Sequence, residues 1–155
     1  MAVNVVIEWD DAQALASIRR AIDAIGDPAR VLGNIGPQLV NSTKDRFTTE
    51  TDPDGLPWEA LKPRYARAKA RKYPGQGILR RENRLYESIV SQVDGDTLLV
   101  GTNVTNKGFP YSASMQLGAP SRNVPARPFL GVSAEDRNDI QAIVMDYLRN
   151  AVAGD

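Results

Sequence analysis

The sequence of 155 residues contains no cysteine and no histidine, and these two absences exclude several classes of function. Without cysteine there is no disulfide framework, no thiolate zinc site and no cysteine nucleophile. Without histidine the chain lacks the usual general base near neutral pH and the commonest ligand of transition metals. Carboxylate or lysine chemistry stays open after these exclusions, but the sequence shows no catalytic constellation of such residues. We therefore expect no catalytic residue, no metal site and no cofactor, and we predict that the protein is not an enzyme.

Long apolar runs are missing as well. The longest uninterrupted runs are a few residues, whereas a helix needs about 20 apolar residues to span a bilayer. The first fifteen residues carry three acidic side chains and no basic one, which is not the pattern of a signal peptide. We expect a soluble protein that is made in a cytoplasm and has no membrane partner.

The charges balance in total, at 19 basic and 19 acidic residues, but they are unevenly distributed along the chain. Residues 62–84, called the basic arm from here on, hold nine basic residues and one acidic residue, Glu82, and sum to +8. The other 132 residues hold 10 basic and 18 acidic side chains and sum to −8. The sequence therefore describes a basic arm attached to an acidic body.

Three interpretations of the basic arm remain open. It can bind phosphate groups, as in a nucleic acid, with a marked dependence on salt. It can be a solvated basic surface without a partner. It can also lie on the acidic body of a neighbouring copy, where complementary charge would orient the contact. The candidate interface residues are Trp58, Arg64, Arg67, Lys69, Arg71, Lys72 and Arg127.

Two of these candidates lie outside the arm and have alternatives of their own. Trp58 follows a turn, so it either fills a small core under that loop or is an exposed interface anchor, a role in which tryptophan is enriched. Arg127 precedes Pro128-Phe129, where we expect Phe129 in the core and Arg127 as an interface donor.

Hydrophobic periodicity and turn residues predict the order of the structural elements. We expect a strand over residues 3–9, a helix from Asp10 that ends at Gly26, helical structure from Pro28 to about Thr49, a turn over 51–58, and a basic helix from Pro63 to Arg71 or Lys72. We further expect a loop over 73–77, a helical turn around Leu85, a hairpin over 89–102 with the turn dipeptide Asp94-Gly95, a short helix within 111–117, an extended segment over 124–130, and a final helix from Ser133 to about Ala151.

Two local patterns refine this prediction. Gly36 and Pro37 interrupt the second helical segment, which predicts two helical pieces or one bent helix. Ser133 and Asp136 approximate a capping box at the start of the last helix. The whole pattern predicts one α+β domain over residues 1–155: a small antiparallel sheet, helices mainly on one face, a long C-terminal helix and the extended basic arm.

Two motifs that could suggest a ligand fail on spacing. Counted from Asp52, the twelfth position of an EF-hand loop is Pro63 and not glutamate, so Asp52 and Asp54 are interpreted as turn residues. Gly75-Gln76-Gly77 lacks the Lys-Ser/Thr of a phosphate loop and is interpreted as a flexible loop.

Four stretches, in this order and spacing, together resemble a known family. They are Asp52-Pro53-Asp54-Gly55-Leu56-Pro57-Trp58 with Leu61, Ile78-Leu79-Arg80 with Arg84-Leu85-Tyr86-Glu87-Ser88-Ile89, Val100-Gly101-Thr102-Asn103, and Pro125-Ala126-Arg127-Pro128-Phe129-Leu130-Gly131. The chain from about Phe47 to Leu148 resembles the phage virion morphogenesis family, the tail completion proteins of Mu-like and P2-like phages and prophages. It departs from the family pattern at 111–118, which lacks the usual histidine, and at Arg81-Glu82-Asn83, which replaces Asp-Thr-Gly.

The resemblance implies a structural virion protein of the neck or tail end, assembled in the host bacterial cytoplasm, that helps to finish the tail and join it to the head. By analogy with neck proteins it implies a homo-oligomeric ring around the DNA channel, often a hexamer, with neighbouring neck or tail proteins as partners. The alternative is a nucleic-acid-binding protein that makes non-specific DNA contacts through residues 62–84.

A ring needs heterologous contacts between different patches of neighbouring copies, and the +8 arm and the −8 body are such patches. We therefore predict that residues 62–77 are partly disordered in the free monomer and become ordered against a neighbour or a tail protein. Strong amide-exchange protection of this segment in the isolated monomer would contradict the prediction.

Overall fold

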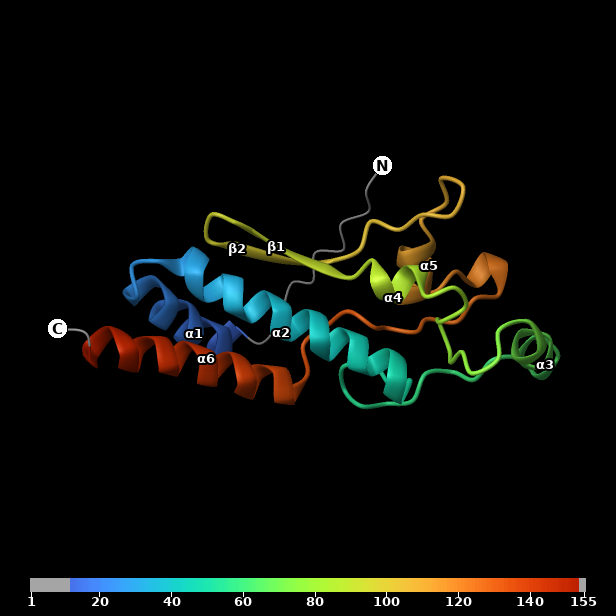
Figure 1. The fold of residues 1–155 in the computed structure, drawn as a ribbon, viewed down its shortest axis with the longest axis horizontal. Coiled ribbons are helices and arrows are strands. Elements are labelled where there is room, and N and C mark those ends of the chain that lie inside the picture. The colour runs from blue at the N-terminus through green and yellow to red at the C-terminus, as the bar shows by residue number, and fades with distance from the viewer. Residues whose placement is uncertain (1–11, 154–155) are drawn as a thin grey trace.

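The computed structural model describes residues 12–153, and these residues form six α-helices and one two-stranded sheet (Figure 1). The elements are α1 (Ala12–Ala24), α2 (Pro28–Thr49), α3 (Pro63–Lys72), α4 (Arg84–Glu87), β1 (Val90–Asp94), β2 (Thr97–Gly101), α5 (Tyr111–Leu117), a short 3-10 helix (Pro120–Arg122) and α6 (Ala134–Ala153). This is the predicted α+β fold with a long C-terminal helix. The predicted strand over 3–9 and the predicted start of the first helix at Asp10 lie outside the described residues.

Helix α2 is the central element of the fold. The Asp27 carboxylate accepts the backbone N–H of Arg30 at 3.3 Å, and Pro28 has the backbone angle that the first turn of a helix needs. The helix then continues in one run through Gly36 and Pro37, so of the two predicted alternatives a single helix is found and two separate pieces are not. Packing of its apolar face outweighs the single backbone hydrogen bond that Pro37 removes.

The hairpin pairs β1 with β2 in antiparallel register, from Val90 opposite Gly101 to Asp94 opposite Thr97. The connecting residues are therefore Gly95 and Asp96, one position later than the predicted Asp94-Gly95. One face of the hairpin packs on α2, and the ribbon view shows that helix running beneath both strands (Figure 1). The predicted position of the helices on one face of a small sheet is confirmed.

Two hydrophobic clusters lie one after the other along α2. The first half of α2 packs with α1, α6 and the inner face of the hairpin around Val31, Leu32, Ile35, Leu39, Ile140 and Val144. The last turns of α2 reach a second cluster of Phe47, Trp58, Ile78, Leu79, Leu85, Ile89, Phe129 and Leu130. The segment 124–130, predicted as extended, lies outside the sheet and supplies two of these residues.

The loops follow the predicted turn chemistry closely. Asp52 accepts the backbone N–H groups of Asp54 and Leu56 at 2.9 and 2.8 Å, so it is the turn residue that the sequence predicts. At the start of α6, Ser133 Oγ accepts the N–H of Asp136 while the Asp136 carboxylate accepts the N–H of Ser133, which confirms the capping box. Within the described residues, no helix is long and apolar enough to cross a membrane.

Candidate functional site

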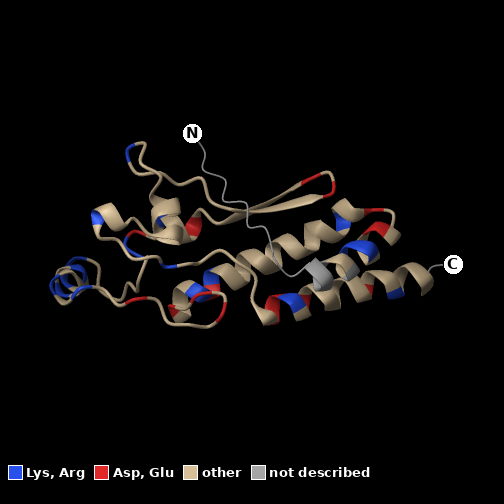
Figure 2. Ribbon diagram, turned by 180° about the vertical axis from the view of Figure 1, so that it is seen from behind, with Lys and Arg blue, Asp and Glu red and all other residues tan. Residues whose placement is uncertain are grey.

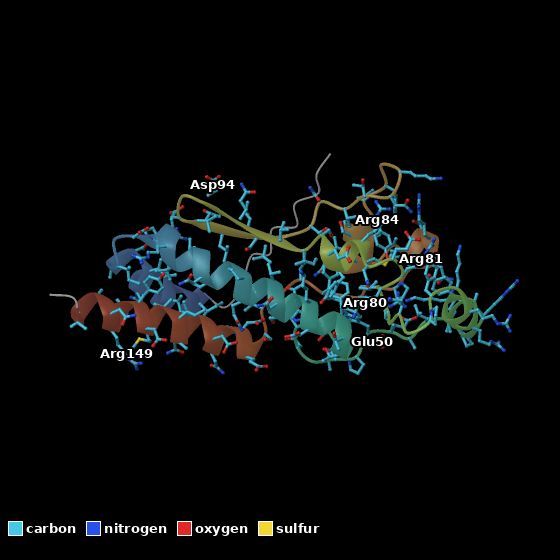
Figure 3. The ribbon with its side chains drawn as sticks, in the orientation of Figure 1. Glu50, Arg80, Arg81, Arg84, Asp94 and Arg149 are labelled. Carbon is cyan, nitrogen blue, oxygen red and sulfur yellow. The ribbon has the colours of Figure 1, made fainter. Side chains whose placement is uncertain are left out.

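A groove of about 550 Å³ lies at the end of the molecule that carries α3, and we call it the basic groove. One side is formed by α3 and by the segment that leads into α4, and the other by residues 104–106, α5 and residues 122–127. Its lining consists of Leu61, Lys62, Tyr65, Lys69, Leu79, Arg81, Glu82, Arg84, Leu85, Val104, Thr105, Asn106, Tyr111, Met115, Arg122, Asn123, Val124, Pro125 and Arg127. Figure 3 shows Arg81 and Arg84 at this end of the molecule, far from Arg149 on α6.

Helix α3 places its basic residues on two different sides. Lys69 points inward, is 6% exposed, and its ammonium donates to the carbonyl of Gly77. Glu50 at the end of α2 accepts the N–H of Ile78 at 2.7 Å, so the loop after α3 is held from both directions. The other basic residues of α3 are exposed: Arg64, Arg67, Arg71 and Lys72.

The opposite wall is held by main-chain contacts. Arg127 is 6% exposed, and its Nε donates to the carbonyl of Glu59 at 2.8 Å. The backbone N–H of Arg127 donates to the carbonyl of Met115 at 2.7 Å, which fixes the extended segment against α5. The guanidinium of Arg122 lies 4.0 Å from the ring centroid of Phe109, a cation–π arrangement, and no carboxylate of residues 12–153 pairs with it.

The groove has a strong excess of positive charge. Its lining includes six basic side chains and one carboxylate, that of Glu82. Among the described residues, Arg81 pairs with Glu82 at 3.3 Å, and none of the other five basic side chains of the groove lies in an ion pair. Cations that outnumber the carboxylates in a partly enclosed space attract an anionic ligand.

Burial changes the ionisation of two residues of the groove. Loss of hydration lowers the pKa of Lys69, and the nearby carboxylate of Glu50 only partly opposes this effect. Burial also raises the pKa of Tyr111, so its phenol stays neutral well into the alkaline range. The described residues contain no group of acidic side chains that could hold a metal ion. The arrangement is suited to binding an anion.

The structure separates the predicted interface residues into two groups. Trp58 is 5% exposed and its indole N–H donates to the carbonyl of Pro128 at 2.8 Å, so the core alternative describes it correctly. Lys69 and Arg127 line the groove from buried positions, and both side chains donate hydrogen bonds to backbone carbonyls. Arg64, Arg67, Arg71 and Lys72 are exposed on α3 outside the groove lining, and their interface role stays a prediction, as does the mobility of 62–77.

Sequence reasoning missed most of the groove. Lys62, Arg81 and Arg84 belong to the basic arm, so the charge count contained a signal for them, although they were not among the candidates. Tyr111 and Arg122 come from segments that follow the arm in the sequence, and no local pattern connects them with it.

The acidic body is not one surface. In the part of the chain that the structure describes, the carboxylates are spread over the loop after α2, the hairpin tip, the α1–α2 connection and α6 (Figure 2). Four of the 18 acidic residues counted outside the arm lie beyond the described residues: Glu8, Asp10, Asp11 and Asp155. The basic end is therefore concentrated, whereas the acidic charge is dispersed.

The fold and the groove belong to a chain whose residues 9–149 match the phage virion morphogenesis family. The match covers most of the sequence, so the chain belongs to this family, and its role is in phage morphogenesis. No solved structure matches the chain.

A curated relative supports the same assignment. The Mu-like prophage FluMu G protein 2 of Haemophilus influenzae is 28% identical over 149 residues, which cover 92% of this chain and 95% of the relative. The two proteins therefore correspond along nearly their whole lengths.

Proposed function

We propose that this protein is a structural component of the phage neck or tail end that helps to finish the tail and join it to the head, acting as a ring around the DNA channel. Membership of the phage virion morphogenesis family supports a structural role, and a Mu-like prophage relative that matches over 95% of its length supports the comparison with Mu-like particles. A homo-oligomeric ring, with neighbouring neck or tail proteins as further partners, is the arrangement that we infer.

The observation that carries the proposal is the one-sided charge of the molecule. Figure 2 shows α3 at one extremity, with much of its ribbon coloured as Lys and Arg. Four of these residues are exposed, and the basic groove is lined by other residues of α3. A concentrated basic end cannot pair with itself across a two-fold axis without repulsion. It favours a head-to-tail contact with a different patch, and such contacts form a ring when the rotation between neighbouring copies closes.

Deletion of the gene from its phage or prophage, followed by complementation, tests the proposal. We expect lysates of the deletion strain to contain filled heads and unattached tails in negative-stain electron micrographs, and wild-type protein to restore whole particles. Complementation with Arg64→Glu/Arg67→Glu/Arg71→Glu should fail, because this variant reverses the charge of α3. The matched control Arg19→Glu/Arg20→Glu/Arg149→Glu changes three exposed arginines distant from α3 and should complement. Normal particles from the deletion strain would overturn the proposal.

A second function is favoured by the exposed face of α3. Arg64, Arg67, Arg71 and Lys72 project from one ten-residue helix, and such a face can neutralise several phosphates of a DNA duplex. Tight, steeply salt-dependent binding of random duplex DNA by the purified monomer, lost in the α3 triple variant, would support this alternative. Absence of DNA binding at physiological salt would leave the assembly role.

A further inference from the structure

The basic groove combines an apolar floor with a cationic rim. Leu79 and Leu85 form part of the floor and are buried, and Met115 packs beside them in the same hydrophobic cluster. Arg84 and Arg122 on the rim are exposed. Its volume of about 550 Å³ lies in the range of sites that enclose several side chains or a small ligand.

This combination favours an acidic polypeptide with apolar side chains over a nucleic acid. A phosphate backbone would neutralise the rim and leave the apolar floor without contacts. Bases could fill it only by stacking on aromatic rings, and among the lining residues that the structure describes Tyr65 alone is an exposed aromatic, at 49%. A peptide that alternates apolar residues with nearby carboxylates satisfies both parts of the groove.

Two acidic sites of the described structure, the hairpin tip and the start of α6, do not have this composition, and the loop after α2 offers one exposed apolar side chain, Leu56, between Asp54 and Glu59. At the hairpin tip, Asp96 already faces Arg19 at 3.7 Å, and the neighbouring Asp94 and Gly95 bring no apolar side chain. Asp52 is used within its own loop, and Asp136 is buried at the start of α6.

Residues 3–11 of the sequence combine apolar side chains with nearby carboxylates, as the groove requires. Every second position of this segment is apolar: Val3, Val5, Ile7 and Trp9. Its three acidic residues lie at the C-terminal end, at Glu8, Asp10 and Asp11, and it contains no basic residue. We propose that the basic groove of one copy binds residues 3–11 of a second copy, with the apolar residues on the floor and the carboxylates at the rim. This inference rests on the proposed self-assembly and names its contact.

The covalent connection to α1 makes the second copy the donor. Asp10 and Asp11 directly precede Ala12, the first residue of α1, and a residue of extended chain spans at most about 3.6 Å. Helix α1 packs on α2 and α6 in the cluster around Val31, on the side of the molecule away from α3 (Figure 1). In the proposed contact, the short connection of Asp10 and Asp11 to Ala12 therefore favours the groove of a second copy over the groove at the α3 end of the same chain. Each copy then offers one segment and one groove, a heterologous contact that repeats around a ring.

The absence of cysteine makes a thiol-specific cross-linking test free of background. Full-length chains with single substitutions, Asn4→Cys and Asn106→Cys, are purified separately, mixed and treated with a short bismaleimide. Asn106 is exposed and lines the groove. We expect a covalent heterodimer from this mixture and none when Arg149→Cys, exposed on α6, replaces Asn106→Cys. An equal yield with both acceptors, or no heterodimer, overturns the inference, as does a preference for intrachain linkage in an Asn4→Cys/Asn106→Cys chain.

Charge exchange tests the proposed chemistry of the contact. Glu8→Lys/Asp10→Lys/Asp11→Lys in the donor, or Arg81→Glu/Arg84→Glu in the acceptor, should each lower the yield at least about tenfold, which corresponds to about 1.4 kcal/mol. Combining the two reversed chains should restore most of it, an outcome that misfolding cannot produce. An unchanged yield with the reversed segment, together with protection of Asn106→Cys by random duplex DNA, would assign the groove to nucleic acid.

The deletion strain tests the proposed function independently of the cross-linking experiment. Particles completed by wild-type protein, together with a failed cross-link, would overturn the groove contact and leave the assembly role standing. Normal particles without the gene would overturn the assembly role, whatever the cross-link shows.

Discussion

The guanidinium of Arg46 donates to a carboxylate oxygen of Asp136 at 2.5 Å, across 90 positions of the sequence. Both side chains are buried. The same guanidinium donates to the carbonyls of Phe129 and Gly131 at 3.0 and 3.1 Å, and the same carboxylate caps α6 through the N–H of Ser133. This network ties the end of α2 to the extended segment before α6, and thereby connects the two hydrophobic clusters.

Removal of one member of this pair should be strongly destabilising. We predict that Arg46→Met lowers the free energy of unfolding by about 3–5 kcal/mol, because it leaves the Asp136 carboxylate buried without its counter-ion. The matched control is Arg149→Met, whose partner Asp146 lies at 3.3 Å on the exposed face of α6 and whose loss should cost at most about 0.5 kcal/mol. Urea unfolding followed by circular dichroism measures both, and equal losses would contradict the prediction.

The sequence predicts most of the secondary structure because those signals are local. The Ser133/Asp136 capping box, the Asp52 turn and the hairpin around Gly95 are each specified within a few residues. The pairing of Arg46 with Asp136 depends on contacts between distant segments, and nothing near either residue indicates it. The run through Gly36 and Pro37 was ambiguous for the same reason, since tertiary packing decides whether the helix continues.

The candidate site was predictable only in part. Charge counting found the basic end, because nine basic residues lie together in the arm. It could not show that Lys69 points inward to Gly77, or that Arg127 donates a hydrogen bond to the carbonyl of Glu59 in the loop after α2. The groove itself is made by bringing Arg122 and the residues near Tyr111 opposite the arm, an arrangement that only the tertiary fold supplies.

Two glycines of α2, three positions apart, should respond to alanine in opposite directions. A Cβ atom at Gly33 would meet nothing within 4 Å, so Gly33→Ala should stabilise the protein by about 0.5–1 kcal/mol through helix propensity. A Cβ atom at Gly36 would lie 2.6 Å from Ser91 Oγ and 2.9 Å from Ser91 Cβ on β1. We predict that Gly36→Ala destabilises by about 1–3 kcal/mol, because the hairpin must move away from α2.

Thermal unfolding of both variants measures this difference. A Ser91→Gly background removes the atoms that the new Cβ would meet at 2.6 and 2.9 Å, so most of the penalty of Gly36→Ala should disappear in it. If Gly36→Ala were as stabilising as Gly33→Ala, the close approach of hairpin and helix would not limit this position.

Trp58 should be a stability residue of the second cluster. Its ring meets that of Phe47 edge to face, with centroids 5.6 Å apart and an interplanar angle of 86°. We predict a loss of about 3–5 kcal/mol in Trp58→Ala, because a large cavity opens beside Phe47. Trp58→Phe keeps most of the packing but leaves the carbonyl of Pro128 without its donor, and should cost about 1–3 kcal/mol. Guanidinium unfolding would contradict this prediction if the two variants were equally stable.

The phenol of Tyr111 should make the protein less stable in alkali. Burial raises its pKa above the ordinary value of 10.0, so the folded state keeps the proton over a range in which the unfolded state has lost it. Because the folded state then binds more protons, the free energy of unfolding falls as the pH rises above about 10. In Tyr111→Phe this contribution is absent, and we predict a shallower decline between pH 10 and 11 in urea unfolding. At pH 7 the phenol is protonated in both states, so the variant should differ from wild type there by a constant of roughly 0.5 kcal/mol or less. Parallel stability curves for the two proteins up to pH 11 would show that the Tyr111 phenol ionises as readily in the folded protein as in the unfolded chain.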